Sequence, residues 1–307
     1  MLTDLKVKMN KRFDMKDLGE IKYCLGLQVI RNRKQGTIRL TQLKYVEGIL
    51  KRFDMANCKP VTTPFEGKIS KDMSPKNQED LDEMKNVPYQ SAVGSLMYAM
   101  LGTRPDISFA VGAVSQYSSN LGKEHWKAVK RIFCYLKGTL DYALEYSGSD
   151  QAVHGYSNAD WARNIDDHHS TTGYAFLLNR GAISWASKKQ LMVALSTTEA
   201  EYMALAQVTK EAIWIRRFLS EINTDLPTKM IVYSDNQSAI SLCRNSTFHA
   251  RTKHIDIRHH FLREKVESGE LEISFCGTED MTADILTKGL CREKHRKFSE
   301  GMGIQND

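Results

Sequence analysis

The run YSNADW, at residues 156–161, closes a strand-like segment. Two more strand-like segments follow it, and then a long helical pattern, a strand, a helix and a further strand. Strands first, and then helices and strands in alternation, are typical of a mixed sheet covered by helices. We therefore predict an α/β domain over residues 147–290. Its expected strands are 152–158, 172–179, 182–187, 229–235 and 271–275, and its expected helices are 197–222, 236–244, 254–268 and 279–288.

The helix expected over 197–222 directs a carboxylate towards the sheet. Glu201 lies four residues before Leu205, so it continues the apolar stripe of that helix. Buried acids are rare unless they are paired or bound to a metal. The alternative is a helix cap or a salt bridge to a lysine, but the capping-box pattern formed with Ser196 assigns the cap to Glu199. The stripe consists of Leu205, Val208, Ala212, Ile215, Leu219 and Ile222.

Two further acids stand where elements of this domain end or begin. Asp235 closes the strand 229–235, and ligands gather at the carboxyl ends of strands in open sheets. The alternative is that Asp235 caps the helix that follows it. Asp284 lies within the short helix expected over 279–288. Clustered carboxylates without histidine or cysteine suit Mg²⁺ or Mn²⁺, and two such ions can activate water and stabilise the leaving oxygen in phosphodiester cleavage.

Residues 153–290 closely resemble the ribonuclease H domain of copia-type LTR retrotransposon polyproteins. The resemblance implies a ribonuclease H fold, with a five-stranded mixed sheet of three antiparallel and then two parallel strands, flanked by helices. It also implies cleavage of the RNA strand of RNA–DNA hybrids, with two Mg²⁺ or Mn²⁺ ions in an intact site. The matching runs are GYSNADWA, DDHHSTTGYAF, GAISWASKKQ, ALSTTEAEY, RTKHIDIRHHFLREKVESGELE and TEDMTADILTK.

Carried over by position, the resemblance assigns the helix glutamate to Glu201, the strand-end aspartate to Asp235 and the last aspartate to Asp284. The first catalytic aspartate falls at Asn158, whose neutral amide lacks the charge that holds a hard cation. Asp160 lies two residues further on and shares the strand face, which makes it a candidate metal ligand. A displacement of about 6–7 Å along the strand nevertheless makes it a poor substitute.

Residues 1–146 resemble the end of the reverse transcriptase and the connection region of the same polyproteins. The resemblance implies an α+β remnant with a primer-gripping hairpin and thumb- or connection-like helices. The Tyr-Val-Asp-Asp run and the earlier catalytic aspartate of such polymerases do not occur, so we do not expect DNA synthesis by this chain alone. The matching runs are DLGEIKYCLGLQV, RFDMANCKPVTTP, VGSLMYAMLGTRPDISFAVG and GKEHWKAVKRIFCYLKGT.

Local patterns in this half predict its elements. The expected hairpin covers 22–30 and 36–40, the expected helices are 42–55, 89–101, 105–119 and 123–138, and 57–87 is expected to be irregular. Residues 291–307 are expected to form a C-terminal tail with a short helix. We expect residues 147–290 to fold independently of residues 1–140.

Basic residues near the expected site are candidates for contacts with the phosphates of an RNA–DNA hybrid. Lys188 and Lys189 lie just before the helix that carries Glu201. Arg251, Lys253 and Arg258 belong to a basic segment before the last strand. For that segment an ordinary solvated face is an equally open alternative.

The chain has 307 residues, of which 41% are hydrophobic, so it is long enough for about two domains with real cores. Its net charge of +6 permits a nucleic-acid partner without demanding one. Six cysteines without a C-x-x-C pair argue against zinc ribbons and disulfide scaffolds. The best apolar stretch, SAVGSLMYAMLG, is shorter than the roughly 20 residues of a membrane span. We expect a soluble intracellular protein, cytoplasmic in a virus-like particle or nuclear, with no membrane partner.

Three hypotheses remain open. The chain is a metal-dependent endonuclease acting on hybrids, a catalytically inactive module that holds hybrid or duplex through its basic surface, or a transposon fragment that does not fold stably. Other parts of the polyprotein are a further expected partner. Cleavage of hybrid with Mg²⁺ distinguishes the endonuclease from the inactive binding module. Cooperative unfolding of the isolated chain distinguishes both of these from an unstable fragment.

Overall fold

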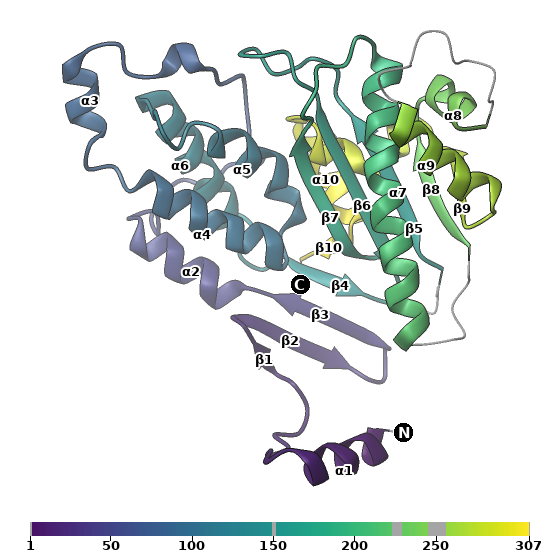
Figure 1. The fold of residues 1–307 in the computed structure, drawn as a ribbon. Coiled ribbons are helices and arrows are strands. Elements are labelled where there is room, and N and C mark those ends of the chain that lie inside the picture. The colour runs from purple at the N-terminus through teal and green to yellow at the C-terminus, as the bar shows by residue number, and fades with distance from the viewer. Residues whose placement is uncertain (1, 149–151, 223–228, 245–255, 307) are drawn as a thin grey trace.

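A five-stranded mixed sheet forms the centre of the second half of the chain in the computed structural model (Figure 1). Its strands are β5 (His154–Ala159), β6 (Thr171–Leu178), β7 (Gly181–Lys189), β8 (Met230–Ser234) and β9 (Leu271–Phe275). They lie in the order β7-β6-β5-β8-β9; the first three are antiparallel, and β8 is parallel to both β5 and β9. The ribonuclease H fold implied by the sequence is thereby confirmed. The structure describes residues 2–148, 152–222, 229–244 and 256–306.

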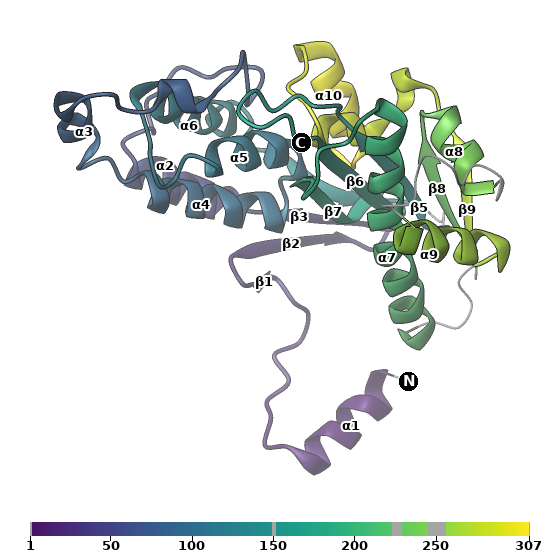
Figure 2. The ribbon, with the colours of Figure 1, turned by 45° about the horizontal axis from the view of Figure 1, so that its top comes forward.

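The two faces of this sheet are covered by different parts of the chain. Neighbouring residues of a strand point to opposite faces, so Phe176 packs beneath the long helix α7 (Thr197–Ile222) while Ala175 packs with the C-terminal helix α10 (Arg292–Gly301). Two further helices, α8 (Gln237–Arg244) and α9 (Asp256–Glu267), join the α7 side. Figures 1 and 2 show α7 and α10 on either side of the strands.

Ser196 caps helix α7 as predicted, while the Glu199 side chain returns to the N–H of Leu195, one residue before the cap. The backbone N–H of Glu199 donates to Ser196 Oγ at 3.2 Å, and the Glu199 side chain accepts from the Leu195 N–H at 2.8 Å. The predicted apolar stripe is buried as far as Ile215, but Ile222 is 62% exposed. The last turn of α7, which includes Ile222, therefore extends beyond the hydrophobic core.

The segment expected as one helix over 279–288 is instead a pair of 3₁₀ turns, η5 (Thr278–Asp280) and η6 (Thr282–Leu286). The second turn lies close against β6. A Cβ at Gly173 would stand 2.7 Å from the Thr287 side chain and 3.0 Å from the backbone oxygen of Ala283. Only glycine fits at this position. Because Gly173 has no side chain, η6 can pack directly against β6, where Gly173 is the sheet partner of Asn158.

The first half forms its own sheet and helical core. The sheet has the order β1-β2-β3-β4-β10, and α2, α4, α5 and α6 enclose one apolar cluster. Helix α1 projects away from the body (Figures 1 and 2). The strands are β1 (Tyr23–Cys24), β2 (Leu27–Asn32), β3 (Thr37–Thr41), β4 (Ala143–Tyr146) and β10 (Ile304–Gln305). The helices are α1 (Leu2–Arg12), α2 (Leu43–Arg52), α3 (Gln78–Met84), α4 (Tyr89–Gly102), α5 (Ser108–Ser115) and α6 (Lys123–Lys137), with 3₁₀ turns η1 (Lys71–Met73) and η2 (Pro105–Ile107).

Two expectations for this half need correction. The segment 57–87 is not wholly irregular, because it contains α3, which Asn77 caps by accepting from the Asp80 N–H at 2.8 Å. The helix expected over 105–119 is shorter, with η2 preceding α5. Among the described residues, no helix is both long and apolar enough to cross a membrane.

The tail after residue 290 ties the two halves together. Strand β10 pairs with β4 of the first half, while the Met302 carbonyl accepts from the Ala182 N–H of β7 at 3.0 Å. Gly303 lies between them at a φ of +82°, and a Cβ there would stand 2.7 Å from the Arg180 carbonyl oxygen. The domain boundary near residue 146 stays a prediction. In the structure, the parts of the chain on the two sides of this boundary pack closely against each other.

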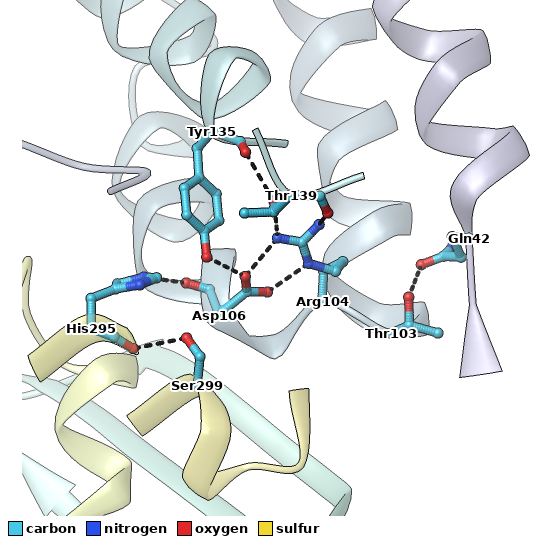
Figure 3. Close-up of polar contacts among 8 residues, drawn as sticks. All are labelled: Gln42, Thr103, Arg104, Asp106, Tyr135, Thr139, His295 and Ser299. Atoms are coloured by element: carbon cyan, nitrogen blue, oxygen red, sulfur yellow. Dashed lines mark hydrogen bonds and ion pairs between the residues drawn. The ribbon is translucent and has the colours of Figure 1, made fainter. Parts of the chain in front are cut away.

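A buried polar network anchors α10 to the helices of the first half (Figure 3). The Arg104 guanidinium donates to both oxygens of Asp106, at 3.0 and 2.7 Å, and to the Thr139 carbonyl at 3.1 Å. Tyr135 donates its hydroxyl to Asp106 at 2.7 Å, and His295 of α10 donates to the Asp106 carbonyl at 3.2 Å. Burial lowers the pKa of His295 and keeps its ring neutral, so the network carries one ion pair and no unmatched charge.

Candidate active site

The structure brings four predicted side chains to one end of the sheet. Asn158 lies in β5, and Asp235 directly follows the parallel neighbour β8, so the two sit at adjacent strand ends. Glu201 arrives from the first turns of α7 and accepts from the Ala159 N–H at 2.9 Å. Asp284 arrives from η6.

Asn158 and Asp284 are in direct contact. The Asn158 amide donates to one oxygen of the Asp284 carboxylate and to Thr287 Oγ at 3.1 Å. Lys288 holds the other carboxylate oxygen at 2.7 Å. Both side chains are buried, with Asp284 only 1% exposed. Burial raises the pKa of Asp284, and the Lys288 ammonium acts against that rise.

Lys288 was not among the residues predicted from sequence. Its spacing of four residues from Asp284 was a usable signal, because residues at this spacing meet on a helix. The turn here is 3₁₀ rather than α-helical, but the two side chains still meet. The ammonium therefore neutralises a carboxylate that the resemblance assigns to metal binding.

Glu201 is the most perturbed acid of the group. Its side chain is 5% exposed, and its second oxygen has no hydrogen-bond partner among the described residues. Burial raises the pKa of Glu201 to about 8; the Ala159 N–H acts against this, and the charges of Asp235 and Asp284 add to it. The predicted orientation of Glu201 towards the sheet is confirmed. Its second oxygen is buried without a hydrogen-bond partner, which favours the protonated form of the carboxyl.

Asp235 does not cap helix α8. That role belongs to Asn236, whose side chain accepts from the Ala239 N–H at 2.9 Å. Asp235 is half-buried and accepts from the Thr278 hydroxyl at 2.8 Å. The capping alternative is therefore wrong, and Asp235 is left at the strand end with its charge close enough to raise the pKa of Glu201.

Asp160 lies apart from this group. Its carboxylate accepts from the Thr171 N–H, and its own N–H donates to the Thr171 carbonyl at 3.1 Å. Within the described part of the chain it makes no hydrogen bond to Asn158, Glu201 or Asp284. Burial raises the pKa of Asp160 to about 6. Its side chain lines a cavity shared with the first half of the chain.

The predicted phosphate-binding residues are only partly described. Lys188 is exposed at the end of β7, whereas Lys189 is held by Asp167 and by Gln116 at 3.1 Å. Arg251 and Lys253 lie outside the described residues. Arg258 falls within α9, but its side chain also lies outside them.

The donor set does not fit a pair of divalent ions. Over the described ranges, no group of three or more histidine, cysteine, aspartate or glutamate side chains is arranged to hold a metal. Both oxygens of Asp284 are occupied by the Asn158 amide and the Lys288 ammonium. A protonated Glu201 also lacks the charge that hard cations require.

The strand order and the four gathered positions define a domain of the ribonuclease H class. Residues 1–67 match the family model described as reverse transcriptase (RNA-dependent DNA polymerase). The Retrovirus-related Pol polyprotein from transposon TNT 1-94 of Nicotiana tabacum is 49% identical to this chain. The match covers the whole of this chain and 23% of the polyprotein. The transposon RE2 polyprotein of Arabidopsis thaliana is 39% identical to this chain, and the match covers 96% of this chain and 20% of that polyprotein. The Secreted RxLR effector protein 161 of Plasmopara viticola is 53% identical, covering 43% of this chain and 94% of that protein.

Over nearly its whole length this chain is homologous to copia-type retrotransposon Pol polyproteins. It spans about a fifth of the length of the two polyproteins. Among solved structures, the N-terminal RNase H domain of a Mycobacterium tuberculosis protein fused to maltose binding protein matches at 12% identity and a TM-score of 0.33. That match covers 48% of this chain and 96% of the other. The fold assignment rests on the strand order and register described above.

Proposed function

We propose that residues 147–290 bind RNA–DNA hybrid and cleave its RNA strand slowly or not at all. The observation that carries this proposal is the hydrogen bond from the Asn158 amide to Asp284. Asn158 occupies the position of the first catalytic aspartate, and its amide supplies a donor where two Mg²⁺ or Mn²⁺ ions would need a shared negative ligand. The remaining acids, Glu201, Asp235 and Asp284, carry too little charge for both ions.

Binding itself does not require that missing charge. Hybrid affinity comes mainly from phosphate contacts with basic residues, and exposed Lys188 lies at the same end of the sheet as the site, two strands away from Asn158. The rest of the Pol polyprotein is a further proposed partner, because the relatives contain much more chain than this one.

The test measures binding and cleavage separately on the same full chain. Fluorescence anisotropy with a labelled hybrid should show binding, and gel analysis with Mg²⁺ should show little or no product. Duplex DNA of the same sequence is the control for specificity. Brisk Mg²⁺-dependent cleavage of the RNA strand by the natural chain contradicts the proposal, as does an absence of binding at low salt.

A further inference from the structure

A cavity of about 320 Å³ lies on the seam between the two halves of the chain, beside the end of β5. Its walls come from the connector 65–69, from 109–117 in and after α5, and from the ends of β5, β6 and β7. Hydrogen bonds join these walls across the seam. Asp166 accepts from the Lys71 N–H and from the Tyr117 hydroxyl, both at 2.9 Å.

Exposed cations line the edge of this cavity, and the Asp160 carboxylate in its wall interacts with Arg163 through space without a close ion pair. No acid in the described part of the chain lies within ion-pair distance of Lys68, Arg163 or Lys188, all of which are exposed at its edge. Lys189 differs, because Asp167 already neutralises it. An anion entering the cavity would therefore meet cations that are free to bind it.

The inner wall combines an aromatic surface with a carboxylate. The rings of Phe65 and Phe109 meet edge to face, with centroids 5.3 Å apart. Asp160 lines the same cavity and accepts from the Thr171 N–H, which leaves further acceptor positions on its carboxylate. A ligand that fits must offer an anionic group, a flat body and a hydrogen-bond donor.

We propose that this seam cavity binds a nucleoside 5′-monophosphate whose base carries an exocyclic amino group. The phosphate lies at Lys68, Arg163 and Lys188, and the base lies along the Phe65 wall. The amino group donates to Asp160, as the cytosine amino group does to acidic side chains. The cavity volume is at the lower end of the range of small-ligand sites, roughly 300–1,000 Å³, which suits one nucleotide.

This cavity shares Lys188 with the proposed hybrid-binding surface, but it includes none of Asn158, Glu201, Asp235 and Asp284 and does not depend on cleavage. The same chemistry has two sources, a free mononucleotide and the phosphorylated 5′ end of a strand. Cytidine monophosphate matches every element of the cavity. Uridine monophosphate lacks the amino group, and cytidine lacks the phosphate.

Isothermal titration calorimetry on the full chain tests the proposal with cytidine monophosphate, uridine monophosphate and cytidine. Loss of the phosphate or of the amino group should weaken binding about tenfold or more, the effect of one charge-assisted hydrogen bond. Arg163→Ala should weaken the binding of cytidine monophosphate by a similar factor. Asp160→Ala should make cytidine monophosphate and uridine monophosphate bind with equal affinity. Arg217→Ala, on the exposed face of α7, should leave binding unchanged.

Gly112 of α5 supplies a matched pair of variants. A Cβ at this position would meet Ser187 at 3.9 Å, an ordinary contact, so Gly112→Ala should fold and bind normally. Gly112→Leu should fill the cavity and abolish binding, with thermal melting as the check on folding. If Gly112→Leu does not fold, Arg163→Ala and Asp160→Ala still decide the matter.

A short oligonucleotide with and without a 5′-phosphate separates the two sources. Phosphate-dependent binding of the oligonucleotide supports a strand end, and binding of cytidine monophosphate alone supports a free nucleotide. Equal binding of cytidine and uridine monophosphates, undiminished binding by a folded Gly112→Leu chain, or no binding at millimolar ligand would each overturn the proposal.

Discussion

The Asn158 amide donates a hydrogen bond to the Asp284 carboxylate, across the gap between β5 and η6. In a site built for two cations this position would hold a second carboxylate, and the two acids would repel each other until metal arrived. Here the contact is attractive, and Lys288 completes the neutralisation at 2.7 Å. Both oxygens of the Asp284 carboxylate are therefore satisfied by the chain's own donors.

Replacing Asn158 by aspartate should restore the first catalytic carboxylate. We expect Asn158→Asp to raise Mg²⁺-dependent cleavage of a labelled hybrid by orders of magnitude, since both ions then gain a shared negative ligand. Asp160→Ala in that background should have a far smaller effect, because Asp160 bonds to Thr171 rather than to the site. If the natural chain cleaves briskly and Asp160→Ala abolishes cleavage, then Asp160 is the metal ligand and our assignment is wrong.

The pH dependence of stability should expose the buried carboxyl of Glu201. Its pKa is about 8 in the folded chain against 4.5 for the unperturbed group, so the folded state retains a proton that the unfolded state releases. The free energy of unfolding should fall as pH rises from about 5 to 8, by up to about 1.4 kcal/mol per pH unit from this group. Denaturant titrations should show a flatter profile for Glu201→Gln. Glu221→Gln, on the exposed end of α7, should keep the natural slope.

Hybrid binding should weaken steeply as salt rises from about 50 to 200 mM, because phosphate contacts release counterions. Lys188→Ala should lower the affinity for all hybrid sequences alike and reduce the salt slope by about one. Lys229→Ala is the control, since it lies at the opposite end of the sheet and pairs with Glu272 at 2.7 Å. Salt-independent affinity, or an equal loss in both variants, would rule out this assignment of Lys188.

Two glycines with positive φ allow the docking of the tail to be measured. Gly303 and Gly269 have φ angles of +82° and +72°, but only Gly303 is crowded, with the Arg180 carbonyl 2.7 Å from its would-be Cβ. Alanine at either position should cost about 1 kcal/mol for the backbone conformation, and Gly303→Ala should cost more because β10 must move. Equal melting temperatures for the two variants would show that β10 contributes little to stability.

The tail should also stabilise the second half when that half is expressed alone. Phe298 is 1% exposed and packs with Ala182 and Ile285, so a fragment 147–307 buries it against the sheet. We expect this fragment to melt cooperatively and at a higher temperature than 147–290, which we still expect to fold. If both fragments melt cooperatively at the same temperature, then α10 does not stabilise the second half, and its packing stabilises the first half instead.

Sequence patterns predicted those parts of the fold that have strong local signals. The Ser196 cap and the apolar stripe from Leu205 to Ile215 follow from side-chain spacing within one helix, and the structure confirms both. Strand β10 spans only Ile304–Gln305 and depends on a partner far away in the chain, so no local pattern indicates it. The choice between Asp235 and Asn236 as the cap of α8 likewise depended on backbone geometry at adjacent residues.

The site was predictable in its positions but not in its contacts. Glu201 could be assigned from periodicity because its burial is a property of one helix. The pairing of Asn158 with Asp284 joins residues 126 positions apart, and Lys288 enters through a 3₁₀ turn that the sequence pattern suggested as a helix. The Asn158–Asp284 contact follows from tertiary packing, which spacing along the chain does not encode, whereas the four-residue spacing of Asp284 and Lys288 was a signal in the sequence.

The pairing of β4 with β10 has a consequence for biosynthesis. The sheet of the first half remains one strand short until Ile304 has left the ribosome, although its other strands end at Tyr146. During translation the β4 edge is therefore open while the whole ribonuclease H-like domain is still being made. In the order of synthesis, the second half is therefore complete before the last strand of the first sheet is available.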